Sequence, residues 1–222
     1  MRLFVYVVVH DTGFAPNPFF GYCTLATCKP RIRHSARVGD WIAGIGSVQR
    51  GQEGKLVFAM RVAEPMSFDE YWNDPRFIQK RPSRFGDAEQ HCGDNIYHRD
   101  PGTGDWIQEP GYHSHNDGTP NRDNVRRDTN PPRVLIAHEF AYLGAAAVDI
   151  PDRFRSWQGS DYFRSVRGHM CNFPDELRNT FIAWLEERSA GTGGLAGTPL
   201  DWAATPPACA ATPPDPSATR RC

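Results

Sequence analysis

Three apolar runs in the first 64 residues predict β-strands. Residues 3–9 (LFVYVVV) are continuously apolar and rich in β-branched side chains, as in a strand buried on both faces. Residues 41–46 (WIAGIG) form a second run, whose glycines indicate a bulge, a barrel corner or the close approach of something flat. Residues 55–64 (KLVFAMRVAE) place alternate apolar side chains on each face. The pattern predicts a sheet built early in the chain.

Helical signals are fewer. Ser67 is followed three residues later by Glu70, which completes a capping box and predicts a short helix over 67–72. Residues 150–152 begin a second short helix. Residues 175–188 form the one long amphipathic helix. Its apolar face is made of Leu177, Phe181, Trp184 and Leu185.

The remaining chain is predicted to be loops and short strands. Residues 93–108 have the turn chemistry of a hairpin, and 133–137 and 142–149 close the sheet as two further strands. The polar stretch 109–132 is long enough that it must be either functional or mobile. From residue 189 onward Gly, Ala, Thr and Pro dominate without apolar periodicity. We therefore expect one domain over 1–188 and a disordered tail over 189–222.

The segment between the first two strands carries cysteines and cations. Residues 23–28 (CTLATC) could form one helical turn, ended by Lys29 and Pro30. If residues 29–37 are extended, Lys29, Arg31 and Arg33 lie on one side of the chain. Such a row is either a solvated edge strand that resists aggregation or a rim that follows phosphates. The residues alone leave both interpretations open.

Composition narrows the class of partner and compartment. The formal net charge of −1 excludes a global basic field, so nucleic-acid binding would need a local patch. The N-terminal apolar run is too short to span a bilayer and lacks a signal-peptide cleavage site. We therefore expect a cytoplasmic protein with no membrane partner. In that compartment we expect the six cysteines to be free thiols instead of disulfide bridges. They contain no CxxC pair, so the usual zinc-ribbon signature is absent.

Several long phrases resemble a known family. They are GFAPNPFFGYCTLATCKPRIR, VGDWIAGIGS, GKLVFAMRVAEPMSFDEYWNDPRF, GDNIYH and GDWIQ. Together they resemble the nucleotide modification associated domain 2 family over most of residues 1 to about 172. That family is associated with DNA-base hypermodification systems. The resemblance therefore implies a role in DNA modification, in a restriction-modification or phage-defence setting, with other base-modification proteins as possible partners.

A more distant resemblance concerns the fold. The segment Arg37-Val38-Gly39-Asp40-Trp41 and the strands after it are similar to the PUA-like superfamily, which includes EVE, YTH and ASCH domains. This likeness implies an α+β fold, a small mixed β-barrel with short flanking helices and a C-terminal helix. Several such domains hold a flipped base in an aromatic pocket. The chain departs from that pattern in the insertion over 73–132.

The first functional hypothesis is binding of a nucleic acid or nucleotide, DNA in particular, through a modified base. Such a site needs flat rings, polar groups for a base edge and cations for phosphates. The candidates are Tyr22, Trp41, Tyr97 and Trp106 for the rings, Asn95 for the base edge, and Lys29, Arg31, Arg33 and Arg37 for the phosphates. For Trp41 the alternative is simple core packing.

The second hypothesis is an enzyme that modifies a nucleobase or nucleotide through a cysteine. Cys23 and Cys28 are the candidate nucleophiles, because nearby cations favour a thiolate. A partner histidine could be His10, His98 or His113. The alternative is that both thiols are small buried hydrophobes. A non-catalytic interaction module is a third possibility.

No cofactor or metal is predicted. The pairs at 113 and 115 and at 169 and 171 have spacing that occurs in metal sites, but no CxxC or HExxH accompanies them. The glycines of 41–46 lack the third glycine and the following helix of a dinucleotide-binding loop.

Overall fold

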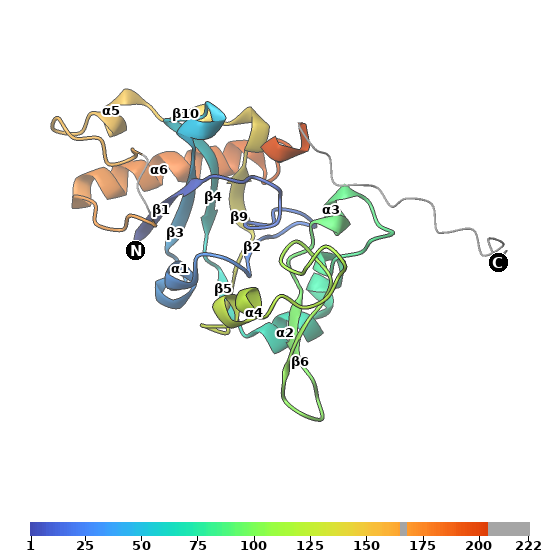
Figure 1. Ribbon diagram of the computed structural model, residues 1–222. Helices are drawn as coiled ribbons and strands as arrows, with labels where there is room; N and C mark the ends of the chain where they lie inside the picture. Colours follow the sequence, from blue (N-terminus) through green and yellow to red (C-terminus); the bar gives the residue numbers. More distant parts are fainter. Residues whose placement is uncertain (165–167, 204–222) are drawn as a thin grey trace.

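The computed structural model describes residues 1–164 and 168–203, and its centre is a five-stranded sheet (Figure 1). Along the sheet the order is β1 (Leu3–Val8), β3 (Trp41–Gly46), β4 (Lys55–Arg61) and β10 (Val148–Asp149), with β9 (Glu139–Tyr142) also pairing with β4. The β1–β3 pair is parallel and the others are antiparallel. The parallel pair requires the chain to cross over between residues 9 and 40, and this crossover carries the candidate cysteines.

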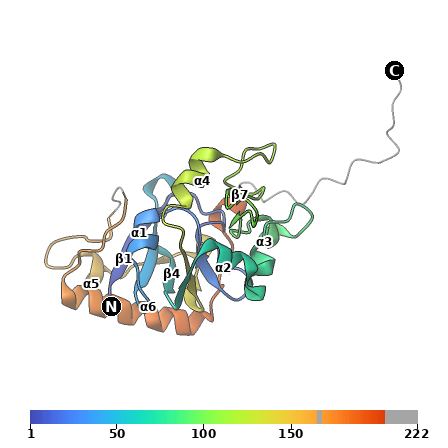
Figure 2. The same ribbon diagram turned by 90° about the horizontal axis from the view of Figure 1, so that it is seen from below.

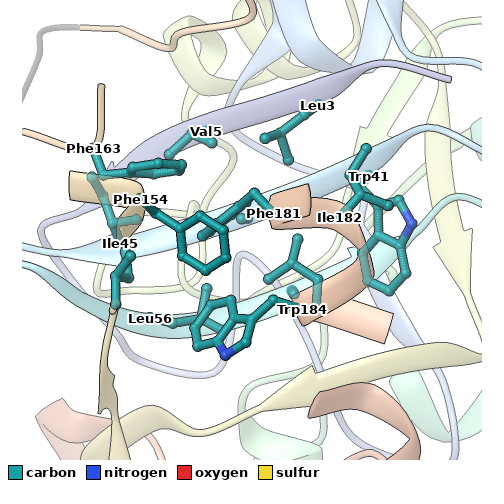
Figure 3. Close-up of a cluster of buried hydrophobic side chains, with 14 of the residues drawn as sticks. Leu3, Val5, Trp41, Ile45, Leu56, Phe154, Phe163, Phe181, Ile182 and Trp184 are labelled. Atoms are coloured by element: carbon teal, nitrogen blue, oxygen red, sulfur yellow. The ribbon is translucent and has the colours of Figure 1, made fainter. Parts of the chain in front are cut away.

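The long helix α6 (Asp175–Thr192) lies along one face of this sheet (Figure 2). Its apolar face packs on side chains that alternate along β1 and β3, and Trp41 is fully buried there (Figure 3). Trp41 is therefore a core residue, which was the alternative interpretation of this ring, and it is not open to a stacking ligand.

A second layer covers the other face of the central sheet. It is the small sheet β2 (Cys23–Leu25), β8 (Val134–Ala137) and β5 (Glu64–Met66), all antiparallel. A second apolar core lies between the two sheets and includes Phe4, Ile42 and Met60. The α+β class is confirmed. The sheets of the described residues do not close into a barrel, because each remains a separate open path of strands, and the PUA-like barrel is not confirmed.

The short elements lie around these layers. They are α1 (Pro30–Ser35), η1 (Val48–Arg50), α2 (Phe68–Asn73), η2 (Pro75–Lys80), α3 (Ala88–His91), the hairpin β6 (Tyr97–Arg99) and β7 (Trp106–Gln108), α4 (Arg122–Asp128), η3 (Gly144–Ala146), α5 (Asp152–Arg155) and η4 (Leu200–Ala203). Within the described ranges no helix is long and apolar enough to cross a membrane.

Local signals with a clear physical cause are confirmed. The strands at 3–8 and 41–46, the 93–108 hairpin and the α6 helix form as predicted. The side chain of Ser67 accepts the N–H of Glu70, and the Glu70 carboxylate accepts the N–H of Ser67. Of the three interpretations of the glycines in 41–46, the bulge occurs, as a register shift between Gly44 and Ile45.

Two predictions in the cysteine-bearing crossover were wrong. Residues 23–25 form strand β2 instead of a helical turn, because β8 offers them a partner edge. Residues 30–35 form helix α1 instead of an extended row of cations, and Pro30 suits its first turn. A helix spaces side chains by about 100° per residue, so the cations at positions 29, 31 and 33 no longer share one side.

The C-terminal part also differs from the sequence-based boundary at residue 189. Helix α6 continues to Thr192, and the segment after it docks back on the domain. The main-chain N–H of Leu200 donates to the carboxylate of Asp11, and that of Ala196 to the carbonyl of Tyr142. Residues 189–203 are thus part of the folded unit. The rest of the predicted tail, with Cys209 and Cys222, lies outside the described residues.

Candidate active site

Three distant segments meet beside the small sheet. Cys28 follows strand β2, His113 comes from the loop after β7, and Asp128 is the last residue of α4. Cys28 and the next residue, Lys29, both have left-handed backbone conformations, with φ of 57° and 38°. Such conformations are costly for side-chain-bearing residues and concentrate at functional sites. The crossover is bent at the position of the thiol.

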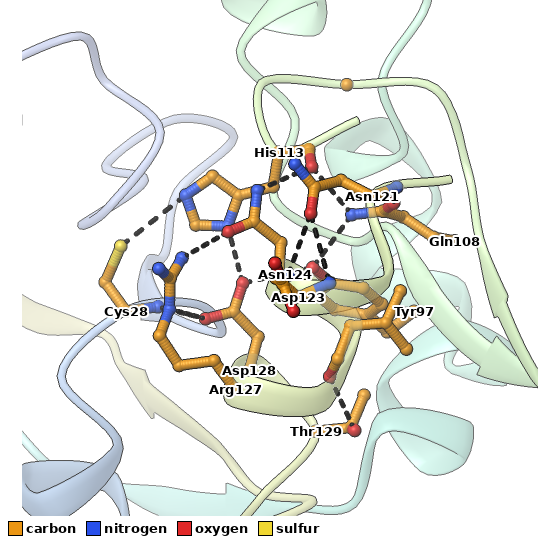
Figure 4. A network of polar contacts seen from close by, with 12 residues as sticks. Cys28, Tyr97, Gln108, His113, Asn121, Asp123, Asn124, Arg127, Asp128 and Thr129 are labelled. Atoms are coloured by element: carbon orange, nitrogen blue, oxygen red, sulfur yellow. Dashed lines mark hydrogen bonds and ion pairs between the residues drawn. The ribbon is translucent and has the colours of Figure 1, made fainter. Parts of the chain in front are cut away.

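The three side chains form a line (Figure 4). The Cys28 Sγ lies 3.7 Å from Nε2 of His113, and Nδ1 of His113 lies 2.5 Å from Oδ2 of Asp128. The other carboxylate oxygen of Asp128 accepts the main-chain N–H of Cys28 at 3.2 Å. A nucleophile, a base and a third group that orients the base therefore occur in the order that nucleophilic catalysis requires.

A layer of neutral donors fixes this line. The Tyr97 hydroxyl donates to Oδ2 of Asp128 at 3.0 Å. The side-chain amide of Gln108 donates to the Tyr97 hydroxyl and to the His113 carbonyl, both at 3.0 Å. Asn124 donates to the same His113 carbonyl at 2.8 Å. The His113 main chain is thus held from both the hairpin and α4, and the Asp128 carboxylate is held from the hairpin.

The guanidinium of Arg33 connects the same segments through hydrogen bonds to their main chains. It is fully buried and donates to the carbonyls of Cys28, Asp128, Pro131 and Arg133 at 2.6–3.0 Å. Burial lowers the pKa of Arg33 to about 10, although the Asp128 carboxylate opposes this shift. Four bonds to main-chain carbonyls and full burial make Arg33 part of the folded interior instead of an exposed cation. It positions the loops that carry the nucleophile and the carboxylate.

The pKa shifts of His113 and Asp128 favour an ion pair between the two side chains. Burial by itself lowers the pKa of His113, but hydrogen bonds to Asp128 and Cys28 outweigh it and raise the pKa of His113 to about 9. Burial likewise disfavours the Asp128 anion, but His113, Arg127 and the main-chain N–H of Cys28 together outweigh burial, and the pKa of Asp128 is lowered. At neutral pH His113 is therefore an imidazolium beside a thiol. A neighbouring cation of this kind stabilises a thiolate.

The other described thiols lack this environment. Cys23 is fully buried beside the Met60 sulfur, and burial raises the pKa of its thiol to about 12. Cys92 is buried too, donates to the Thr12 carbonyl, and burial raises its pKa to about 12. Cys171 is exposed. Among the thiols that the structure describes, Cys28 alone contacts a histidine, while the His113 side chain keeps 16% of its surface exposed.

A family model described as nucleotide modification associated domain 2 matches residues 1–206. The chain belongs to this family. No curated protein and no solved structure matches it. Because the matched range includes Cys28, His113 and Asp128, the whole line lies within the nucleotide modification associated domain.

Within this domain the predicted ring and base-edge residues do not share a pocket. Tyr97 joins the Asp128 network, whereas Trp41 lies under α6. Asn95 is buried and donates to the carbonyls at positions 71 and 77. Tyr22 is half-buried with its ring edge-on to that of Phe77. Trp106 packs against Phe68 and lies under the Arg99 guanidinium. Tyr22, Tyr97 and Trp106 therefore belong to one apolar cluster as packed side chains, whereas Trp41 belongs to the separate core under α6.

The predicted cations divide into buried and available groups. The Lys29 ammonium lies 4.2 Å from the centre of the Tyr6 ring, and burial lowers its pKa. Arg31 and Arg37 are exposed on and after α1. A cation that the sequence did not indicate, Arg127, places its Nε 3.4 Å from the Asp128 carboxylate. Lys29, which precedes α1, and Arg127 of α4 therefore border the Cys28 line.

Sequence reasoning missed Asp128 and Gln108. Their only signal was the length and polarity of the stretch around 109–132, which favoured a functional segment without naming its residues. His113 was one of three candidate partners. Among the described residues no group of three or more His, Cys, Asp or Glu side chains is arranged to hold a metal ion.

Proposed function

We propose that this protein is a cysteine-dependent enzyme that acts on a nucleotide or nucleobase within a DNA-modification system. Cys28 is the nucleophile, His113 the general acid and base, and Asp128 the group that orients and charges His113. The observation that carries the proposal is the continuous line from the Cys28 sulfur through His113 to Asp128.

The line supports a two-step displacement. The Cys28 thiolate attacks an electrophilic carbon of the substrate and forms an S–C bond, while Nε2 of His113 gives its proton to the leaving group as the old bond breaks. Water or a second substrate then gives a proton to Nε2 and attacks the same carbon. The S–C bond breaks, and the thiolate and the imidazolium are both restored.

Two observations support a nucleotide as substrate. The family is described as nucleotide modification associated. The nucleophile is also bordered by cations, of which Lys29 is adjacent in the chain and Arg127 lies beside Asp128. Cations at a reaction centre suit a substrate that carries phosphate.

Site-resolved alkylation tests the nucleophile without a known substrate. The protein is treated with iodoacetamide at pH 6, and each cysteine is quantified by peptide mass spectrometry. Cys171 serves as the internal control for an exposed thiol. We expect Cys28 to react at least about ten-fold faster than Cys171, because a histidine cation beside a cysteine sulfur favours its reaction as a nucleophile. Cys23 and Cys92 should stay unmodified.

The variant His113→Gln separates activation from simple exposure. It keeps a polar side chain of similar reach but removes the charge, so Cys28 should lose its advantage over Cys171. Equal rates for the two cysteines in the unaltered protein, or a fast Cys28 rate that survives His113→Gln, would overturn the proposal.

A second candidate function is binding of DNA without catalysis, and the exposure of Arg31 and Arg37 favours it. For this function Arg31→Ala with Arg37→Ala should weaken DNA binding and reduce its salt dependence by up to about two phosphate contacts. Unchanged affinity and salt slope would exclude this patch. Base-modification proteins as partners and a cytoplasmic location remain predictions from the sequence.

A further inference from the structure

A groove lies on the surface formed by the segments before and after the β6–β7 hairpin. It consists of two adjoining hollows of about 470 and 380 Å³, which share the wall formed by residues 82–85. Neither hollow is lined by Cys28 or His113. We call this feature the Phe85 groove, after the aromatic residue that lines both hollows.

Two aromatic side chains are exposed in the groove. Phe85 is 82% exposed, and none of the ring or cation–π contacts of the described residues involves it. Tyr112 is 40% exposed, with the buried Phe14 ring stacked at 5.5 Å. Exposure of a large apolar ring to water is unfavourable in free energy. A flat ligand that covers the ring removes this apolar surface from water. Phe85 therefore offers an open stacking surface.

The charge of the groove suits an anion. Arg84 lines both hollows, and the larger one also contains His91 and His115. No carboxylate is among the residues that line the larger hollow. Glu109 lines the smaller one, where its carboxylate lies 2.9 Å from Nε2 of His98. An incoming phosphate would meet a guanidinium that no described carboxylate neutralises.

The groove is joined to the candidate active site through one short turn. Tyr112 and Ser114 line the larger hollow, and His113 between them points to Cys28. The Ser114 hydroxyl accepts the N–H of Gly111 at 3.0 Å and donates to its carbonyl at 2.8 Å, which fixes the turn. A ligand in the groove would thus lie against the back of the segment that carries the general base.

We propose that the Phe85 groove binds single-stranded nucleic acid, with an unpaired base stacked on Phe85 and a phosphate held by Arg84. Stacking faces are available only when a base is unpaired, and two hollows in series on either side of a shared wall suit successive nucleotides of a strand. The identification of this strand as the substrate of the enzyme rests on the proposed function. The binding site itself does not depend on catalysis.

The test is fluorescence anisotropy with a labelled ten-residue thymidine oligonucleotide at several salt concentrations. Phe85→Ala should weaken binding by roughly 5- to 100-fold, because base–aromatic stacking contributes that much. The matched control is Ile78→Ala, since Ile78 is 52% exposed and lines neither hollow. Arg84→Ala should weaken binding and lower the salt slope by about one, whereas Arg122→Ala, an exposed arginine outside both hollows, should not.

Two results would overturn the inference. One is the absence of oligonucleotide binding by the unaltered protein at low salt. The other is a Phe85→Ala variant that binds as tightly as Ile78→Ala. Competition by thymidine monophosphate as strong as that by the oligonucleotide would assign the groove to free nucleotides and overturn the assignment to a strand.

The result of the groove test can be distinguished from the result of the test of the proposed enzyme. Cys28→Ser should bind the oligonucleotide unchanged, because Cys28 lines neither hollow. Fast alkylation of Cys28 with no strand binding would reject the groove alone. Strand binding that depends on Phe85 with an ordinary Cys28 would reject the enzyme alone.

Discussion

The carboxylate of Asp128 accepts the main-chain N–H of Cys28 across 100 residues of sequence. The same carboxylate holds His113, so one side chain fixes both the backbone of the nucleophile and the ring of its base. Asp128 is fully buried, and its two oxygens also accept from the Tyr97 hydroxyl and the Arg127 guanidinium. The geometry of the candidate site therefore depends on this residue more than on the thiol itself.

Replacement of the Asp128 carboxylate by an amide should separate the effect of its charge from the effect of its shape. Asp128→Asn keeps the size of the side chain but removes the charge that supports the His113 imidazolium. We expect alkylation of Cys28 at pH 6 to slow toward the rate of Cys171, and the free energy of unfolding to fall by about 1–3 kcal/mol, as for the loss of a charged hydrogen bond. Urea denaturation and peptide mass spectrometry measure the two effects. A variant with an unchanged Cys28 rate would contradict the role of Asp128.

The raised pKa of His113 should appear in the pH dependence of stability. Its folded-state pKa of about 9 exceeds the ordinary value of 6.5, so the imidazolium stabilises the fold fully below pH 6.5 and this contribution is lost as the pH rises through 9. The unfolding free energy of the unaltered protein should exceed that of His113→Gln by up to about 3 kcal/mol at low pH. The difference should disappear above pH 9. A constant difference from pH 6 to 10 would show that His113 is not charged in this way.

Arg33 should behave as a structural residue. Arg33→Met would remove the Arg33 donors from the carbonyls of Cys28, Asp128 and Arg133, and one of the two donors from the carbonyl of Pro131. We expect a loss of about 3–5 kcal/mol in the free energy of unfolding, measured in urea. The exposed Arg31 on the same helix is the matched control, and Arg31→Met should change stability by less than about 0.5 kcal/mol. Equal stability of the two variants would return Arg33 to the list of possible phosphate contacts.

Gly44 of strand β3 should not tolerate a methyl group. A Cβ atom at Gly44 would overlap the ring of Phe58 on the neighbouring strand and the side chain of Val8. Gly44→Ala should therefore destabilise the protein by about 1–3 kcal/mol through overpacking. Gly191→Ala is the opposite case, because a Cβ in helix α6 meets nothing within 4 Å. It should stabilise by about 0.5–1 kcal/mol. Thermal unfolding of both variants compares them directly.

Much of the local structure could be predicted from the sequence. The strands over 3–8 and 41–46, the capping box at Ser67 and the amphipathic face of α6 are set by side chains a few residues apart. Their signals depend on the period of the chain, the shape of the β-branched residues and the chemistry of one cap. None of these requires knowledge of a distant partner.

The crossover around Cys28 was decided by the tertiary structure. Residues 23–25 are a strand because β8, more than 100 residues away, offers a paired edge. The polar network is formed in the same way, since Cys28, His113 and Asp128 come from three loops and helix ends that carry no shared sequence pattern. The sequence by itself determined the strands, the long helix and the presence of a thiol among cations. Only the folded chain decided which thiol meets a charged histidine, because hydrogen bonds and burial depend on distances in space that local patterns do not encode.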